Sequence, residues 1–173
     1  MGLDMYLHRR HYIGGMYDFD GHHVEGSVDI TINGKQLPID IEKVEYIEER
    51  VGYWRKANQI HRWFVINVQG GVDECRPFDV DIDQLKELLE ICKLVDSKIK
   101  LVGKNGEKVI ENVDEIKELL PTQSGFFFGS TDYGKWYADQ VKYTIEILEQ
   151  VVKEDEEYRQ QGFDPEYEYL ASW

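Results

Sequence analysis

Cysteine, proline and positive charge are scarce in this sequence of 173 residues. The two cysteines, Cys75 and Cys92, do not form a CxxC pair, so neither a disulfide scaffold nor a zinc site of paired cysteines is expected. Cys92 falls at an apolar position of a helical pattern, where a free cysteine behaves as a small buried hydrophobe. We therefore expect a reduced, buried thiol and a cytoplasmic protein.

Basic residues and long apolar runs are also few. The 20 lysines and arginines against 34 aspartates and glutamates give a formal charge of −14, which argues against general binding of DNA or RNA because phosphate contacts require a basic surface. No segment approaches the roughly 20 apolar residues that a membrane helix requires, and the N-terminus MGLDMYLHRR lacks the apolar run of a signal peptide. We expect neither bulk nucleic acid nor a membrane as a partner.

The apolar and aromatic residues that are present suffice for one folded domain over residues 1–173. They make up 42% and 13% of the chain, which is too much for a disordered segment.

Residues 2–8 alternate between apolar and polar side chains, as a half-buried strand does. Asn33-Gly34 predicts a hairpin with a type I′ turn. From Gly52 to Val68, apolar residues recur at three- and four-residue steps, which predicts a helix.

The next segments carry cap and turn signals. Asp81, followed by Gln84 three residues later, predicts a capping box and a helix that runs to about Val95. Asn105-Gly106 predicts a second hairpin. Residues 112–120 predict a short helix that ends at a proline.

A long helix and a closing strand complete the pattern. Ser130 or Thr131 is expected to cap the long helix, and the alternation of tyrosines after residue 165 predicts a final strand. The expected fold class is α+β, an antiparallel sheet of short strands packed by about three main helices. The helix that contains Val51 is expected to be the central packing element.

The predicted helix from Val51 to Phe64 carries the first candidate site. On one flank an indole lies beside hydrogen-bonding groups, which suits a base or a sugar as ligand. A second row offers guanidinium groups that can bind phosphate. The alternative is that the asparagine and the histidine are satisfied internally at the edge of the core. The residues are Trp54, Asn58 and His61 on the flank and Arg55 and Arg62 on the second row.

The stretch LPTQSGFFFGST, Leu120 to Thr131, carries the second candidate site. Its three consecutive phenylalanines fit either a strand buried on both faces or the wall of a ligand pocket. The hydroxyl residues that follow would stand at a helix N-terminus, which favours anions such as phosphate, although capping alone would also select them. The ligand-binding candidates in this stretch are Ser124, Phe126, Phe128, Ser130 and Thr131.

Positive charge is concentrated early in the chain. Five of the seven arginines precede residue 63, and Arg9 and Arg10 are the first of them. Together with the helix arginines they could form one pocket for a phosphorylated small molecule, because arginine offers two parallel donors to phosphate. The alternative is a solvated surface with scattered ion pairs that contribute little.

The loop YDFDGHH, Tyr17 to His23, contains residues that could bind a divalent metal. Carboxylate and imidazole groups are ligands of such ions. Adjacent histidines in a loop bounded by glycine are also typical of a solvated surface, and no other metal motif occurs. We predict no metal and no cofactor, with this loop as the remaining candidate. Its potential ligands are Asp18, Asp20, His22 and His23.

Three blocks in order resemble an uncharacterised family of short bacteriophage and prophage proteins. The blocks are MGLDMYL, VGYWRKANQIHRWF and ELLPTQSGFFFGSTDY with the helix after it. The segments from Gly14 to Glu45 and from Asp96 to Val113 do not contribute. The resemblance implies an accessory protein in the cytoplasm of the phage host. Many such proteins counter host defences, either by blocking an immune protein or by sequestering its nucleotide messenger.

These observations predict a binding protein and not an enzyme. The expected function is capture of a small nucleotide, or of a nucleotide-derived signal, through its phosphate and its base. One alternative is an acidic protein that inhibits a host enzyme and imitates the charge of DNA, because Glu146 to Glu168 holds nine acidic residues against two basic ones. Another alternative is a metal-dependent phosphodiesterase that uses the Tyr17–His23 loop and His61. Each of the three could act as a homo-oligomer.

Overall fold

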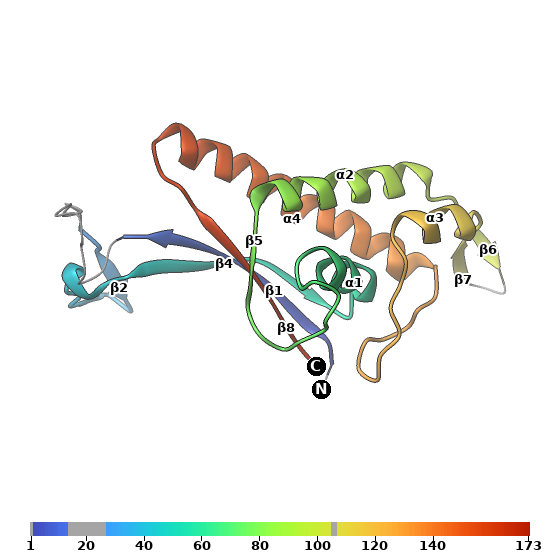
Figure 1. Cartoon of the computed structure of the whole chain (residues 1–173), viewed down its shortest axis with the longest axis horizontal. Coiled ribbons are helices and arrows are strands. Elements are labelled where there is room, and N and C mark those ends of the chain that lie inside the picture. The colour runs from blue at the N-terminus through green and yellow to red at the C-terminus, as the bar shows by residue number, and fades with distance from the viewer. Residues whose placement is uncertain (1, 14–26, 105–106) are drawn as a thin grey trace.

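The main sheet has four antiparallel strands and brings the first and last strands of the chain together (Figure 1). The computed structural model describes residues 2–13, 27–104 and 107–173. The strand order is β4-β1-β8-β5, so β1 lies between β4 and β8 and pairs with both. The strands are β1 (Asp4–Tyr12), β4 (Tyr46–Arg55), β5 (Phe78–Val80) and β8 (Glu166–Ser172).

Helices α1 and α4 pack against the same face of this sheet. The Phe64 ring of α1 stacks on the Tyr169 ring of β8, with centroids 3.8 Å apart. The Trp54 indole N–H of β4 donates to Thr144 Oγ1 of α4 over 3.0 Å. Helix α2 runs beside α4 (Figure 1). The predicted α+β class, with an antiparallel sheet of short strands, is confirmed. The three helices are α1 (Asn58–Asn67), α2 (Ile82–Lys98) and α4 (Lys135–Gln160).

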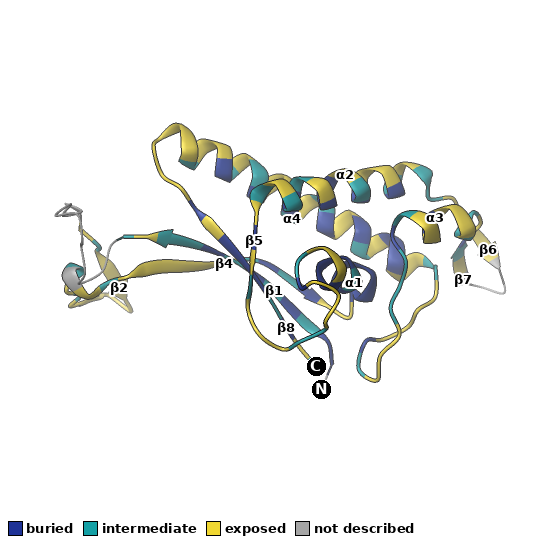
Figure 2. Cartoon of the chain, viewed as in Figure 1, coloured by how far each residue is buried: buried dark blue, intermediate teal, exposed yellow. Residues whose placement is uncertain are grey.

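Smaller elements lie at the two ends of the molecule. The β1–β4 ribbon extends away from the helices toward the β2–β3 hairpin, and the β6–β7 hairpin and α3 lie at the opposite end (Figure 1). Figure 2 shows that burial is concentrated where the sheet meets the helices, whereas the β2–β3 hairpin is exposed. The bounds are β2 (Ile30–Ile32), β3 (Lys35–Leu37), η1 (Ile41–Lys43), β6 (Leu101–Lys104), β7 (Glu107–Ile110) and α3 (Val113–Leu119).

Several local signals of the sequence are confirmed. Asn33 and Gly34 both have positive φ, at 50° and 77°, as a type I′ turn requires. The Asp81 backbone N–H donates to Gln84 Oε1 over 3.0 Å and forms the predicted capping box of α2. Cys92 is buried, and this burial raises the pKa of its thiol to about 12, so the thiol stays protonated. The Asn105-Gly106 turn lies outside the described residues, although β6 and β7 pair on either side of it.

The helix predicted from Gly52 to Val68 is wrong in its first third. Strand β4 continues to Arg55, and α1 begins only at Asn58. Two features end the strand: Lys56 adopts a left-handed backbone with φ of 56°, and its N–H donates to the Leu3 carbonyl over 2.8 Å. Pairing with β1 overrides the helical spacing, because Gly52 and Trp54 also satisfy the two-residue period of a half-buried strand. Val51 therefore lies in the sheet and not in a central helix.

The predictions for the Phe126–Thr131 segment are also corrected. The phenylalanines form a turn and not a strand, and the Phe128 N–H donates to the Gly125 carbonyl over 3.2 Å. Gly129 has a φ of 84°, a conformation that favours glycine and redirects the chain. The long helix begins at Lys135, with Gly134 and neither hydroxyl residue at its N-cap. Anion binding at a helix N-terminus by Ser130 and Thr131 thus loses its structural basis.

A methyl group added at Gly52 should destabilise the fold. An added Cβ atom would lie 2.9 Å from the Trp54 ring, 3.1 Å from Leu7 Cβ and 3.2 Å from Ile147 Cγ2. Such overpacking costs about 1–3 kcal/mol. We expect Gly52→Ala to lower the free energy of unfolding in urea by this amount. Gly103→Ala is the control, because nothing lies within 4 Å of an added Cβ there. Equal unfolding free energies for both variants would contradict the packing at Gly52.

Candidate functional site

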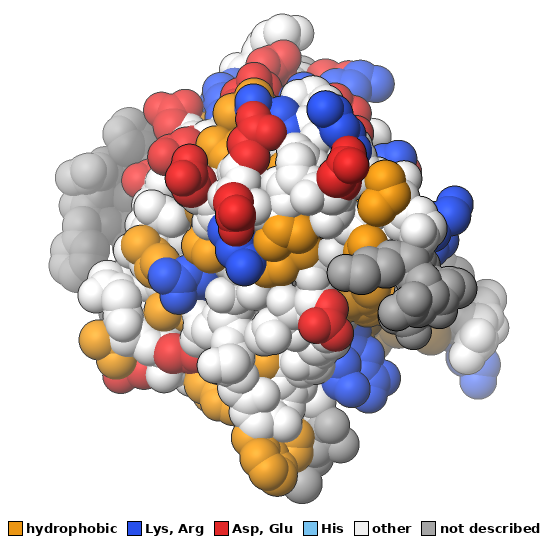
Figure 3. Space-filling view, turned by 90° about the vertical axis from the view of Figure 1, so that its right-hand side faces the viewer, with side chains coloured by type: hydrophobic (Ala, Val, Ile, Leu, Met, Phe, Trp, Pro, Cys, Tyr) orange, Lys and Arg blue, Asp and Glu red, His pale blue; other side chains and the backbone are white. Residues whose placement is uncertain are grey.

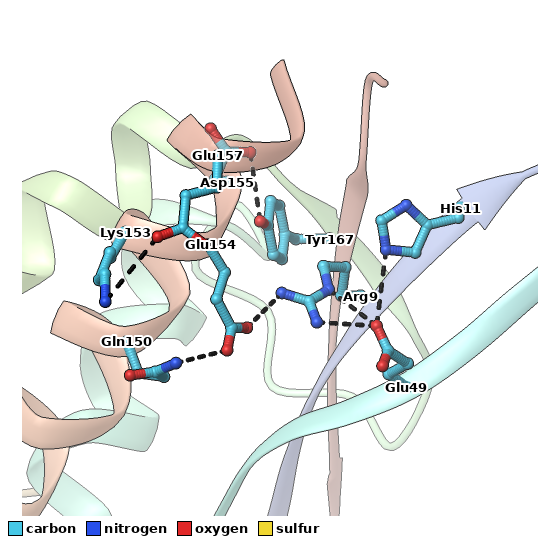
Figure 4. A network of polar contacts seen from close by, with 9 residues as sticks. All are labelled: Arg9, His11, Glu49, Gln150, Lys153, Glu154, Asp155, Glu157 and Tyr167. Carbon is cyan, nitrogen blue, oxygen red and sulfur yellow. Dashed lines mark hydrogen bonds and ion pairs between the residues drawn. The ribbon is translucent and has the colours of Figure 1, made fainter. Parts of the chain in front are cut away.

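Arg9 is buried in a network of ion pairs between the sheet and α4 (Figure 4). Its Nε and Nη2 donate to Glu49 Oε2 over 3.0 and 2.7 Å, and its Nη1 donates to Glu154 Oε2 over 2.5 Å. Burial alone would lower the pKa of Arg9, but the hydrogen bonds that Arg9 donates to the two glutamates outweigh burial and raise it. The guanidinium also lies over the Tyr158 ring, 4.7 Å from its centroid. Its donors are occupied within the protein, so Arg9 is not available to a phosphate.

The other predicted arginines do not converge on one place either. Arg10 is paired with Glu48 and Glu168, at 2.7 and 2.5 Å. Arg55 is exposed and lies 3.9 Å from a carboxylate oxygen of Asp4. Arg62 is half-buried, and its Nε has no hydrogen-bond partner among the described residues.

Asn58 connects the start of α1 to the loop before α4. Its Nδ2 donates to the carbonyls of Phe128 and Ser130 over 3.1 and 2.8 Å, and its Oδ1 accepts from the Gln123 backbone N–H over 3.2 Å. The side chain is only 1% exposed. The helix and the loop that were expected to share a ligand do lie together. They meet through direct packing, and Asn58 has no donor left for a ligand.

His61 lies in a buried chain of polar side chains. Its Nδ1 is 2.8 Å from the Tyr169 hydroxyl, and its Nε2 is 3.0 Å from Asp73 Oδ1. Gln123 Nε2 donates to the other Asp73 oxygen over 3.2 Å, and the edge of the imidazole contacts the Phe128 ring. Burial lowers the pKa of His61, although Asp73 opposes that shift, so the imidazole is neutral at pH 7. The network connects α1, the loop after it, β8 and the loop before α4.

The aromatic and hydroxyl candidates are divided between core and solvent. Trp54 and Phe128 belong to the core, with exposed fractions of 1% and 4%. Phe126 is 94% exposed, and Ser124 is exposed beside it. Two of the predicted ligand-binding residues, Ser130 and Thr131, line a hollow of the surface.

That hollow is a cleft of about 1140 Å³ between β7, α3, the loop before α4 and the first residues of α4. Its wall combines three lysines with a tyrosine, a tryptophan and three hydroxyl side chains. Ser130 and Thr131 contribute two of the hydroxyls, so part of the predicted stretch does line a hollow. The lining residues are Lys108, Val109, Ile110, Val113, Lys117, Thr122, Ser130, Thr131, Asp132, Tyr133, Gly134, Lys135 and Trp136.

The lysines make the cleft locally positive in an acidic protein. Lys108 and Lys117 are exposed and form no ion pair with a described carboxylate. The Lys117 ammonium lies 5.4 Å from the centroid of the Tyr133 ring, a cation–π contact. Lys135 pairs with Asp139, one turn further along α4. Figure 3 faces this end of the molecule and shows positively charged side chains next to hydrophobic ones, with acidic side chains gathered toward the top.

The carboxylate of Asp132 is held at the side of the cleft. It accepts a hydrogen bond from Ser130 Oγ over 2.6 Å, and the Asp132 backbone N–H donates to the same Oγ over 3.0 Å. Tyr133 is fixed by the Thr122 backbone N–H, which donates to its hydroxyl over 3.0 Å. Trp136 is 55% exposed, so its indole is open to solvent at the edge of the cleft. The cleft therefore offers an aromatic surface beside two lysines that form no ion pair with a carboxylate in the described part of the chain.

The cleft residues that sequence reasoning missed are the lysines and the two aromatic side chains. Tyr133 and Trp136 follow the predicted stretch within six residues and could have been included from their position alone. Lys108 and Lys117 carry no such signal, because they come from β7 and α3 and only the tertiary structure brings them to α4.

The predicted metal loop cannot be compared with the structure, because Asp18, Asp20, His22 and His23 lie outside the described residues. Within residues 2–13, 27–104 and 107–173, metal-ligating side chains come together at one place, formed by His8, Glu48 and Glu168.

Comparisons with known proteins give no match: neither a family model nor a curated protein nor a solved structure resembles the chain significantly. In the described part of the chain, no helix is both long enough and apolar enough to cross a bilayer.

The neutral state of His61 predicts how stability depends on pH. An unfolded histidine has a pKa of about 6.5. Because the folded pKa is lower, the unfolded chain takes up the proton first, and stability falls as pH drops below this value, by up to about 1.4 kcal/mol per pH unit. We expect urea unfolding between pH 7.5 and 5.5 to show this loss in the natural chain and a shallower one in His61→Gln. The same slope in both proteins would contradict a neutral, buried imidazole.

Proposed function

We propose that the cleft between β7, α3 and α4 captures a small phosphate-bearing ligand of the nucleotide class without catalysis. The observation that carries the proposal is the pair of lysines, Lys108 and Lys117, which form no ion pair with a described carboxylate in a chain whose net charge is −14. Ammonium groups without a carboxylate partner attract phosphate, and a concave wall strengthens their combined field.

The aromatic residues of the cleft account for the nucleotide part of the proposal. A half-exposed indole at Trp136 and the ring of Tyr133 provide surfaces on which a base can stack. The hydroxyls of Thr122, Ser130 and Thr131 add donors and acceptors for a sugar or a phosphate. The volume of about 1140 Å³ is slightly above the range of roughly 300–1,000 Å³ that is typical of small-molecule sites.

The residues that line the cleft are better suited to binding a ligand than to converting it chemically. The cleft contains no histidine or cysteine among its lining residues, and the carboxylate of Asp132 is hydrogen-bonded to Ser130. Histidine is the commonest general base, and cysteine is intrinsically a strong nucleophile. A protein that holds a nucleotide signal without converting it would suit the counter-defence role of a phage accessory protein in the host cytoplasm.

The alternative of charge mimicry has weaker support. Six of the nine acidic residues between Glu146 and Glu168 form ion pairs inside the protein. Three of these pairs contain a side chain that is less than 10% exposed: Glu154 with Arg9, Asp155 with Arg159, and Glu168 with Arg10. Their charges are partly neutralised, which makes the stretch a poorer imitation of a phosphate backbone.

Calorimetric titration with cyclic dinucleotides, ADP-ribose and nucleoside diphosphates tests the proposal. For the ligand that binds, we expect Lys108→Glu/Lys117→Glu to lower the affinity more than 30-fold, because each reversal replaces an attraction by a repulsion of similar size. Lys142→Glu is the control: it makes the charge change of one of these two reversals on an exposed residue of α4 outside the cleft, and it should keep the affinity within threefold.

The fluorescence of Trp136 gives a second measurement. Acrylamide should quench this exposed indole, and a bound ligand should protect it; Trp136→Phe should remove the protection. Denatured protein straight from purification should release the ligand if the cleft is filled in cells. The proposal fails if the whole panel gives no heat and no ligand is released, or if binding survives the double charge reversal.

A further inference from the structure

The sheet carries a second polar cluster, on the face that α1 and α4 leave uncovered. Along β1, Met5, Leu7 and Arg9 point toward the helices, so His8 between them points to the opposite face. His8 is the direct partner of Glu168 in the β1–β8 pair. Glu48 comes from β4 on the other side, where the register shifts next to His8. Three adjacent strands thus bring one imidazole and two carboxylates to one place.

The ligand atoms of the three side chains converge. His8 Nδ1 lies 3.8 Å from Glu48 Oε1 and 4.0 Å from Glu168 Oε1, and all three atoms lie within 4.8 Å of one another. Ligands bound to one metal ion at about 2.0–2.2 Å are separated by roughly 3–3.5 Å. Binding would therefore require the two glutamate side chains to rotate toward His8.

His8 Nδ1 is a buried nitrogen without a partner. It is inaccessible to solvent and has no hydrogen bond with any described residue. The nearest carboxylate oxygens, at 3.8 and 4.0 Å, are beyond hydrogen-bond length. Buried polar atoms are nearly always satisfied, and exceptions often mark a bound ion or another function. This unsatisfied nitrogen is an observation independent of the carboxylates, and it is directed toward them.

Arg10 holds the two glutamates in place through their other oxygens. Its Nε lies 2.7 Å from Glu48 Oε2 and its Nη1 lies 2.5 Å from Glu168 Oε2. Both Oε1 atoms are therefore left on the side of His8. Arg10 neutralises one of the two carboxylate charges. Arg50, the cross-strand partner of His8 on β4, forms no ion pair with a described carboxylate and lies over the Tyr53 ring instead, 5.9 Å from its centroid. Hydrogen bonds of this kind to ligating carboxylates are typical of the second layer of a metal site.

From this geometry we propose that His8 Nδ1, Glu48 Oε1 and Glu168 Oε1 bind a divalent transition metal of the zinc type. An imidazole with two carboxylates suits Zn²⁺, Co²⁺ or Mn²⁺ and does not suit Mg²⁺, which prefers oxygen ligands and keeps several waters. Three protein ligands leave a fourth position open for water or for a substrate oxygen. The site lies on the opposite face of the sheet from Arg9 and the helices and shares no residue with the lysine cleft.

Titration of chelator-treated full-length protein tests this site. We expect Zn²⁺ and Co²⁺ to bind one per chain in calorimetry, and Co²⁺ to give visible absorption bands of a low-coordinate complex with a nitrogen ligand. His8→Ala and Glu168→Gln should each weaken Zn²⁺ binding at least tenfold and abolish the Co²⁺ bands. Glu48→Gln, at an edge strand, should weaken binding even if a change in the central strands impairs folding.

Two controls separate this site from other histidines. His11→Ala changes a histidine of the same strand that lies toward Glu49 and α4 (Figure 4) and should leave binding unchanged. His22→Ala/His23→Ala should also leave it unchanged. The proposal is overturned by three results: no stoichiometric binding to the folded natural chain, binding that is retained in both His8→Ala and Glu48→Gln, or binding that is lost only in the His22/His23 variant.

Discussion

The position of β1 between β4 and β8 is the constraint on which the rest of the structure depends. Leu3 and the inward-facing residues of β1, Met5 and Leu7, are fully buried, and the strand satisfies its backbone groups on both edges. Strands β1 and β8 are the first and last strands described, so their pairing brings the two ends of the chain together. Helices α1 and α4 both pack on one face of the resulting sheet. The central pair of the sheet joins residues that are far apart in sequence, so the entropy of closing this long loop slows its formation.

Strand β1 also carries different polar groups on its two faces. Arg9 points toward the helices and is neutralised by Glu49 and Glu154, whereas His8 and Arg10 point away. Breaking the buried pairs of Arg9 would leave carboxylates next to a core, which is costly, so the network positions α4 on the sheet more than it serves a ligand. Alternation along one strand thus yields a structural ion-pair network on one side and an incompletely satisfied polar cluster on the other.

The parts of the fold that the sequence predicted well are those set by local chemistry. The type I′ turn at Asn33-Gly34, the capping box of α2 and the alternation of β8 depend on neighbouring residues alone. The prediction failed at two places. At Lys56, one residue with a left-handed backbone separates the end of β4 from the start of α1. At Gly129, the chain turns just before Ser130 and Thr131, where the start of the long helix was expected. In both places tertiary contacts decide between two patterns that the same residues satisfy, and no local signal distinguishes them.

The candidate site could be predicted only in part, because its charges come from separate elements. The predicted residues Ser130 and Thr131 line the cleft, but the expected arginines are paired or dispersed, and lysines of β7 and α3 lie beside the hydroxyls instead. At physiological ionic strength, charges are screened over about 8 Å, so the acidic surface does not cancel the field inside the cleft. An extended polyanion would also meet that acidic surface, whereas a small phosphate compound would meet mainly the lysines. The charge of −14 and the lysine cleft are therefore compatible, and together they favour small anions over nucleic acid.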